Sequence, residues 1–255
     1  MISENSFIHP SVQLGKNVTI GPFSYIGEGV VIGDGCIIES HVVIKKNTKI
    51  GKMNRFYQGA SIGEDCQDKK YKGEETFLYI GDNNIFREAI TVHRGTVQDN
   101  GKTVIGNNNL LMGYCHIAHD CVIGNNVVAA NGSSFAGHCM IDDYATISGM
   151  CGIHQKSKIG CYSFIAAGSM IRLDVPPFVT VGGHGKPVPK GLNLEGLRRN
   201  NFTDSDISEL KKAYRVFYRS GSSFMDSIAL LESNKNPRVK EFVRFIMNSN
   251  RGVIK

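Results

Sequence analysis

An aliphatic side chain returns at every sixth position along most of this chain. The series runs from Ile8 to Ile62, resumes from Ile80 to Val92, and resumes again from Ile105 to Ile171, with an occasional Phe or Ala in phase. A period of six matches neither the 3.6-residue turn of an α-helix nor the two-residue alternation of a single strand. It is the hexapeptide repeat of a parallel β-helix, in which each repeat forms one face of a triangular prism. The sequence therefore predicts an all-β fold in which three repeats, about 18 residues, complete one coil.

The repeat is interrupted twice. Ile62 and Ile80 are 18 residues apart where one repeat needs 6, so the first interruption adds 12 residues. Val92 and Ile105 are 13 residues apart, so the second interruption adds 7. Long excursions from a regular scaffold often carry function, although a surface loop without function is the plain alternative.

Beyond the repeat the pattern becomes helical. The repeat ends near 174–177, and a Gly/Pro-rich link follows at 182–187. Thr203 and Asp206 resemble a helix start with a capping box, Gly221 is a plausible stop, and further helical patterns run through Phe224–Leu231 and Arg238–Met247. We expect a β-helix domain at 1–190, with loops near 63–79 and 97–104, and a small α-helical domain at 191–255.

The charge and hydropathy of the chain indicate which classes of partner and which cellular location to expect. The formal net charge of +6 favours acidic partners, such as phosphates or an acidic carrier protein. The basic residues form no long run and no recognition helix or finger motif is visible, so we expect no nucleic-acid partner. The N-terminus lacks the pattern of a secretory signal and no apolar run is long enough to span a bilayer, so we expect a cytoplasmic protein without an integral membrane segment.

Six of the seven cysteines share one slot of the repeat, four residues after an aliphatic position. Other repeats place small residues in that slot, so cysteine is expected to be a small buried side chain there. No paired spacing typical of a metal site is present, and only Cys161 is out of phase. The six are Cys36, Cys66, Cys115, Cys121, Cys139 and Cys151.

Stacking the repeats after removing both interruptions brings histidines together. Ile62, Val92, Ile117, Phe135 and Ile153 then share one face of the prism. That face carries four histidines in one column, a fifth that points outward just before Ile117, and the start of both interruptions. The five are His93, His119, His138, His154 and His116.

Histidine is the natural general base near neutral pH. Lys70, on the first loop, and Arg94 add positive charge to the same column. The pattern favours a groove for an anionic substrate with a reacting hydroxyl group.

The run His116–Cys121, with Thr91–Thr96, closely resembles the UDP-N-acetylglucosamine O-acyltransferases of lipid A biosynthesis. The likeness covers almost the whole chain, including both interruptions and the helical tail. Further matching runs are Gln67–Tyr71, Ala136–His138, His154–Gln155, Asp174–Pro177 and Asn193–Arg199.

This resemblance implies a left-handed β-helix, an exception to the usual right-handed crossover, and a homotrimer with active sites in grooves between neighbouring prisms. It implies transfer of a (3R)-3-hydroxyacyl group from acyl carrier protein to the 3-OH of UDP-N-acetylglucosamine, without a cofactor or a metal ion. His119 would be the general base, Asp120 would orient it if the two meet at a corner, and the Gly137 N–H would bind the oxyanion.

The resemblance also implies binding roles. His138 and Lys70 would help to bind substrate or the acyl phosphopantetheine, and His93 belongs to the same binding face. The sugar nucleotide would contact Gln67, Asp68, His116, His154 and Gln155, while Asn193, Glu195, Arg198 and Arg199 would hold uridine and phosphates.

The chain departs from the family pattern at three places. Tyr114–Cys115 stands where Asn-Ala is expected, and Lys156 stands where an aromatic residue is common. Ala166 and Ala167 replace the Gly-Gly of long-chain members. Extra methyl groups near an acyl groove would shorten the accepted chain, so these two alanines bear on acyl length.

Three alternatives remain open from the sequence. A zinc enzyme of the same fold, similar to the hexapeptide carbonic anhydrases, would use His116, His119 and His138 as ligands. An N-acyltransferase would act on a 3-amino UDP-sugar with the same base and the same groove. A trimeric scaffold without catalytic activity is the third.

Overall fold

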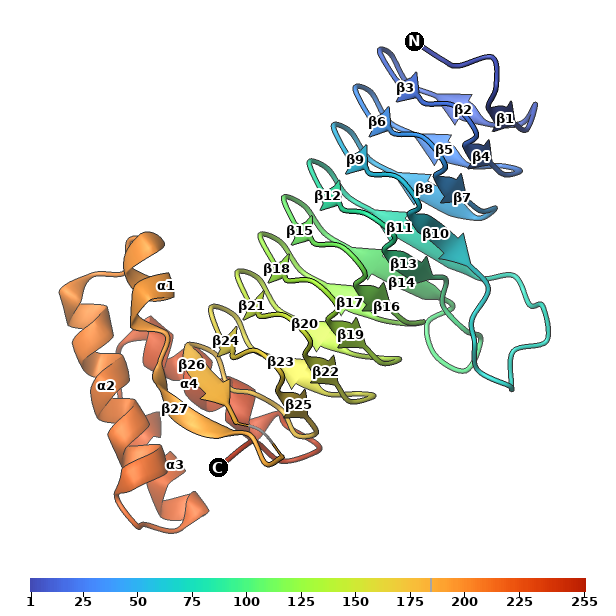
Figure 1. Cartoon of the computed structure of the whole chain (residues 1–255). Helices are drawn as coiled ribbons and strands as arrows, with labels where there is room; N and C mark the ends of the chain where they lie inside the picture. The colour runs from blue at the N-terminus through green and yellow to red at the C-terminus, as the bar shows by residue number, and fades with distance from the viewer. Residues whose placement is uncertain (184) are drawn as a thin grey trace.

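The computed structural model describes residues 1–183 and 185–255, so His184, in the Gly/Pro-rich link, lies outside the described residues. The chain forms a left-handed parallel β-helix, as expected, followed by a helical C-terminal part that packs at the end of the prism (Figure 1). Short parallel strands make the three faces of the prism, and each strand pairs with the strand one coil away.

Three sheets form the faces in the described part of the chain. The first sheet holds β1 (Phe7–Ile8), β4 (Tyr25–Ile26), β7 (Val43–Ile44), β10 (Ser61–Glu64), β13 (Thr91–His93), β16 (His116–Ile117), β19 (Ser134–Phe135), β22 (Gly152–Ile153) and β25 (Met170–Ile171). The second holds β2 (Gln13–Leu14), β5 (Val31–Ile32), β8 (Thr48–Ile50), β11 (Phe77–Ile80), β14 (Lys102–Ile105), β17 (Val122–Ile123), β20 (Met140–Ile141) and β23 (Lys158–Ile159). The third holds β3 (Thr19–Ile20), β6 (Ile37–Ile38), β9 (Arg55–Phe56), β12 (Ile85–Phe86), β15 (Leu110–Leu111), β18 (Val128–Ala129), β21 (Thr146–Ile147), β24 (Phe164–Ile165), β26 (Val179–Gly182) and β27 (Val188–Leu192).

The strand register confirms the alignment obtained by removing the two interruptions. Ile62 pairs with Val92, and Val92 pairs with Ile117, all on the first sheet. The first excursion joins β10 to β11 and the second joins β13 to β14, so both leave the prism after first-sheet strands. The two excursions project from the same side of the prism (Figure 1).

The repeat side chains fill the interior of the prism. From Ile20 onward every aliphatic or aromatic residue of the series is buried, while Ile8 and Leu14 at the open end are half-buried. All seven cysteines are buried free thiols, which confirms the structural interpretation of the six in phase. Cys161 is buried as well, and its thiol donates to Glu241 Oε1 at 3.1 Å.

Asparagine occupies the same slot as cysteine in three successive coils. Asn54, Asn84 and Asn109 are buried, and the side-chain oxygen of each accepts the backbone N–H one coil further on. These distances lie between 2.7 and 2.9 Å. Because each amide also donates to a backbone carbonyl, the slot tolerates a polar side chain without leaving a buried group unsatisfied.

The prediction that the repeat ends near 174–177 was wrong. Val175 bridges to Ile159 on the second sheet, and β26 pairs in parallel with β24 on the third sheet. Ile171 and Val175 are only four residues apart, so a shortened corner breaks the count of six although the coil continues. β27 then turns back and pairs antiparallel with β26.

The helical tail matches most of the predicted pattern. Its helices are α1 (Leu194–Arg199), α2 (Asp204–Arg219), α3 (Phe224–Glu232) and α4 (Pro237–Met247). Thr203 caps α2 by accepting the N–H of Asp206 at 3.1 Å, as its position predicted. Helix α1 was not predicted, because six residues are too few to show a helical period. None of the helices in the described residues could cross a membrane by length and apolar character.

Candidate active site

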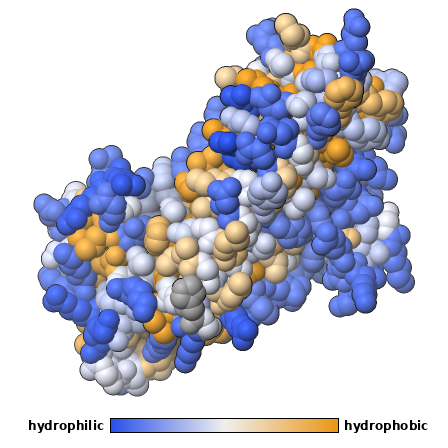
Figure 2. All heavy atoms as spheres, viewed as in Figure 1, coloured by the Kyte–Doolittle hydropathy of each residue, from blue (hydrophilic) through white to orange (hydrophobic). Residues whose placement is uncertain are grey.

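A groove of about 550 Å³ runs along the first sheet beside the first excursion. Side chains that flank the buried aliphatic of each strand point outward and form its floor. The excursions beside it, at the right of the prism, present largely hydrophilic side chains (Figure 2). The groove is lined by Gln67, Asp68, His93, His116, Ala118, His119, Ser134, Ala136, Gly137, Gly152, Ile153, His154, Met170, Ile171 and Arg172.

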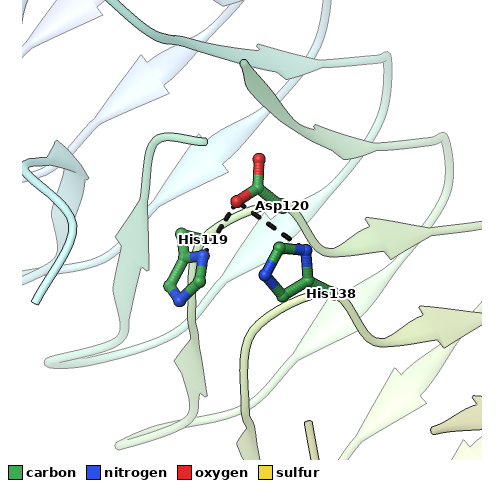
Figure 3. A group of neighbouring side chains, drawn as sticks. All are labelled: His119, Asp120 and His138. Atoms are coloured by element: carbon green, nitrogen blue, oxygen red, sulfur yellow. Dashed lines mark hydrogen bonds and ion pairs between the residues drawn. The ribbon is translucent and has the colours of Figure 1, made fainter. Parts of the chain in front are cut away.

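His119 and Asp120 meet at the corner that follows β16. Asp120 has a φ of 58°, and this left-handed backbone turns its carboxylate back toward the preceding side chain. His119 Nδ1 lies 2.8 Å from Asp120 Oδ2 (Figure 3). The corner geometry that an orienting role requires is therefore present.

Thr96, on the second excursion, completes this arrangement. Its backbone N–H donates to Asp120 Oδ1 at 2.9 Å and its hydroxyl donates to Oδ2 at 2.6 Å. Burial raises the pKa of Asp120, but the hydrogen bonds from His119 and Thr96 outweigh it and leave this pKa below its ordinary value. Since the carboxylate can only accept, the contact favours the neutral His119 tautomer with its proton on Nδ1, which leaves Nε2 as an acceptor.

Gly137 lies against the His119 ring. A Cβ atom at this position would stand 2.5 Å from both Cε1 and Nε2 of His119, closer than real Cβ contacts come. The Gly137 N–H has no acceptor among the described residues. Glycine therefore allows the imidazole to approach the backbone, and it leaves one buried N–H beside the His119 ring.

His138 packs edge-on against the His119 ring. The two ring centroids are 4.9 Å apart with the planes at 87°, and His138 Nδ1 lies 2.6 Å from Asp99 Oδ2. His138 lines a second cavity of about 400 Å³ rather than the groove. Both imidazoles are directed toward the Asp120 carboxylate (Figure 3).

His93 and His116 are uncharged members of the groove. Burial lowers the pKa of His93 to about 4, with further lowering from His116, His119 and Arg94. Burial and then His119 lower the pKa of His116, whose Nδ1 lies 2.7 Å from the Thr91 hydroxyl. At neutral pH both imidazoles are therefore hydrogen-bonding groups rather than cations.

One cluster in the described residues has the geometry to hold a metal ion, and it consists of His119, Asp120 and His138. Their ligand atoms lie within 4.8 Å of one another. The zinc alternative requires His116 in this set, but the cluster contains Asp120 in its place.

Comparison with known proteins gives one consistent family. The sequence family described as "Udp N-acetylglucosamine O-acyltransferase; Domain 2" matches residues 174–254, and bacterial transferase hexapeptide repeats match 1–32, 11–46 and 102–133. LpxA, a UDP-N-acetylglucosamine acyltransferase from Bacteroides fragilis, is 41% identical over 100% of both chains, with a TM-score of 0.98. The chain belongs to the UDP-N-acetylglucosamine acyltransferase family.

Two further solved structures of the same family support this assignment. The UDP-N-acetylglucosamine acyltransferase of Francisella novicida is 41% identical over 100% of this chain and 94% of its own, with a TM-score of 0.97. LpxA from Acinetobacter baumannii is 42% identical over 100% of this chain and 99% of its own, with a TM-score of 0.96. This protein is therefore an acyltransferase enzyme.

Several predicted site residues of the acyltransferase lie away from the groove of their own chain. Lys70 and Gln155 are exposed and do not line it. Asn193 caps α1 by accepting the Gly196 N–H at 3.1 Å, and Glu195 pairs with Arg199 at 3.0 Å. These residues, with Arg198, sit beside the third sheet rather than the first.

Ala166 and Ala167 follow β24 at the corner that leads into β25. Ala166 lies close to Gly182, where an added Cβ would stand 2.7 Å from its methyl carbon. Neither alanine lines the groove, although Met170 and Ile171 of the adjoining strand do.

Arg94 does not face the groove of the acyltransferase, contrary to the sequence-based expectation. It is almost fully buried and donates to the Gly63 carbonyl, to Asp65 and to the Tyr71 hydroxyl. The first excursion folds over this position, so the guanidinium anchors the excursion rather than meeting a substrate.

Several lining residues of the groove were not predicted from the sequence. Ser134, Gly152 and Met170 precede a repeat aliphatic on the first sheet, so the same stacking argument could have identified them. Thr96 and Asp99 lie on the second excursion, where no period places them.

Proposed function

We propose that this acyltransferase moves a (3R)-3-hydroxyacyl group from the phosphopantetheine thiol of acyl carrier protein to the 3-OH of UDP-N-acetylglucosamine. The observation that carries the proposal is the position of His119 at the groove, with Nδ1 2.8 Å from an Asp120 carboxylate that Thr96 also holds. This contact supports a tautomer in which Nε2 is available as the base. The net charge of +6 suits an acidic protein as acyl donor. A donor of this kind implies a cytoplasmic reaction.

The chemistry needs one base and one oxyanion site. His119 Nε2 takes the proton of the sugar 3-OH while this oxygen attacks the thioester carbonyl carbon. The negative charge that develops on the carbonyl oxygen is stabilised by the Gly137 N–H. When the tetrahedral intermediate collapses, the C–S bond breaks and the thiolate takes the proton from Nε2. Asp120 stabilises the imidazolium formed in between, while His138 supports the far side of His119.

We infer the binding roles from the family resemblance, which the positions of the groove residues support. Gln67, Asp68, His93, His116 and His154 meet the sugar nucleotide in the groove, with Gln155 beside them. Lys70 and His138 hold the acyl phosphopantetheine arm. Ala166 and Ala167 restrict acyl length through the corner that supports Met170.

We infer a homotrimer as the active form. The groove is open on one side in a single chain, and Asn193, Glu195, Arg198 and Arg199 do not reach it. These four residues would hold uridine and the phosphates in the groove of a neighbouring copy, where arginine suits paired phosphate contacts.

The test is a transfer assay with UDP-N-acetylglucosamine, its 3-amino analogue and a panel of hydroxyacyl carrier proteins, followed by mass spectrometry. We expect an ester product, and kcat about 1000-fold lower or more in His119→Ala. His9→Ala, at the distant open end of the prism, is the matched control. Acylation of the 3-amino analogue alone would instead support an N-acyltransferase, and full transfer by His119→Ala would contradict the assigned base.

A further inference from the structure

The C-terminal segment returns to the prism after α4 and is anchored on both sides of Arg251. The Ser249 hydroxyl donates to Asp174 Oδ2 at 2.6 Å. Val253 forms a parallel bridge with Asp174, and Ile254 is buried. The backbone around Arg251 is therefore held in place, close to the groove end formed by β25.

The Arg251 side chain contacts two residues that line the groove. Its Nη2 donates to the Arg172 carbonyl at 3.0 Å and lies 3.2 Å from His154 Nδ1. Both Arg172 and His154 line the groove, whereas Arg251 itself lines the second cavity. The Arg251 guanidinium therefore does not line the groove itself, but it contacts His154, which does.

Two contacts at His154 Nδ1 favour opposite tautomers of this imidazole. A guanidinium offers only donors, so a hydrogen bond from Arg251 requires Nδ1 to accept and favours the proton on Nε2. The Gln155 carbonyl, 3.1 Å from the same Nδ1, favours the opposite tautomer because a carbonyl can only accept. Arg251 and Gln155 therefore compete for Nδ1.

We propose that Arg251 is a positioning residue that keeps His154 in its Nε2–H tautomer, so that His154 donates a hydrogen bond to an oxygen of the sugar nucleotide. Without the guanidinium, Nδ1 would donate to the Gln155 carbonyl and Nε2 would become an acceptor facing substrate oxygens. The tautomer depends on the contacts at His154 Nδ1 and not on the identity of the substrate, while its consequence for substrate binding rests on the proposed function.

The first experiment reads the tautomer directly. ¹⁵N-histidine NMR of the full-length protein at neutral pH, with His154→Ala to assign the signal, should show the Nε2–H tautomer. Arg251→Ala should shift the signal toward Nδ1–H, and Arg251→Lys, which keeps a cationic donor, should retain Nε2–H. An Nε2–H signal that is unchanged in Arg251→Ala would overturn the proposal, whatever the enzyme's substrate.

The second experiment is a double-mutant cycle in the transfer assay. Arg251→Ala should raise KM for UDP-N-acetylglucosamine about tenfold with little change in kcat, which is the effect expected from one substrate hydrogen bond. In the His154→Ala background the same change should add almost nothing, because Arg251 acts through His154. Arg244→Ala, exposed on α4, is the control and should match the parent.

An equal effect of Arg251→Ala in both backgrounds would show that the arginine acts on stability or on substrate independently of His154, and would overturn the proposal. Failure of the parent protein to acylate UDP-N-acetylglucosamine would count against the proposed function instead. The NMR result then still decides the tautomer.

Discussion

The His119 ring rests on the backbone of Gly137, so the proposed base and the proposed oxyanion site are in contact. The ring can occupy its position only because residue 137 has no Cβ. The same glycine supplies the free N–H beside Nε2. The absence of a side chain at Gly137 therefore has two effects. It leaves space for the His119 imidazole, and it keeps the backbone N–H of Gly137 accessible.

Gly137→Ala should lower kcat by at least about 100-fold, because the added methyl group displaces the imidazole from its productive position. Steady-state transfer and thermal unfolding together check this, and the melting temperature should change little. Gly149→Ala is the control, since its added Cβ would meet only the Asn131 carbonyl at 3.3 Å. Wild-type kcat in Gly137→Ala would rule out this account.

Helix α4 packs on the prism through a cluster that disfavours negative charge. Asp142, beside β20, and Glu241 of α4 line a cavity of about 220 Å³ together with Cys161. Burial, and then the charges of Asp143 and Glu241, raise the pKa of Asp142 to about 6. The fold therefore favours the protonated carboxyl group, and ionisation at neutral pH destabilises the docking of the tail.

Asp142→Asn should make the protein more stable than the parent at pH 8. The pKa of Asp142 is higher in the folded protein than the ordinary value of 3.8, so its stabilising contribution is present below about pH 4 and is lost as the pH rises through 6. The asparagine variant should gain at most about 3 kcal/mol in the free energy of unfolding at pH 8, and nothing near pH 4.

Urea unfolding at the two pH values measures this difference. Glu232→Gln, an exposed neutralisation at the end of α3, should show no such gain. A gain of equal size at pH 4 and pH 8 would mean that packing, and not ionisation, accounts for the change.

In the whole molecule, large apolar side chains are exposed along one edge of the prism. Phe23, Tyr114 and Met150 are 61%, 71% and 68% exposed. Each lies two residues before a first-sheet strand, so the three belong to one edge beside the face that carries the groove. Apolar side chains gathered at an edge are typical of a protein interface, which supports association through this edge.

Tyr114→Asp should weaken the proposed trimer, because it adds a charge where we expect a buried apolar contact. Aspartate tolerates the φ of 61° at this position, so the backbone should be preserved. Light scattering should give three times the 28.0 kDa chain mass for the parent and a smaller mass for the variant, with loss of transfer. Asn108→Asp, with a φ of 58° on another edge, is the control. A trimeric Tyr114→Asp would exclude this edge as the interface.

The prism and its histidine face were predictable because both follow from a regular repeat, in which each coil is displaced from the previous one by the same distance along the prism axis. Each coil adds a fixed number of residues, so residues far apart in the sequence meet whenever the count between them is regular. Counting through both interruptions paired Ile62 with Val92 and Val92 with Ile117, as observed. The count failed at Val175, where a corner is two residues short and the regular translation is interrupted.

The chemistry of the groove depends on contacts that follow no period. Thr96 reaches Asp120 from an excursion, and Arg251 reaches His154 from 97 residues away. Arg94 was expected to face substrate but is buried under the first excursion. The repeat is a local pattern and therefore specifies which residues share a face. The two excursions and the C-terminal tail reach that face only in the folded chain. The positions of the protons on its histidines, and the charges of these histidines, therefore depend on tertiary contacts.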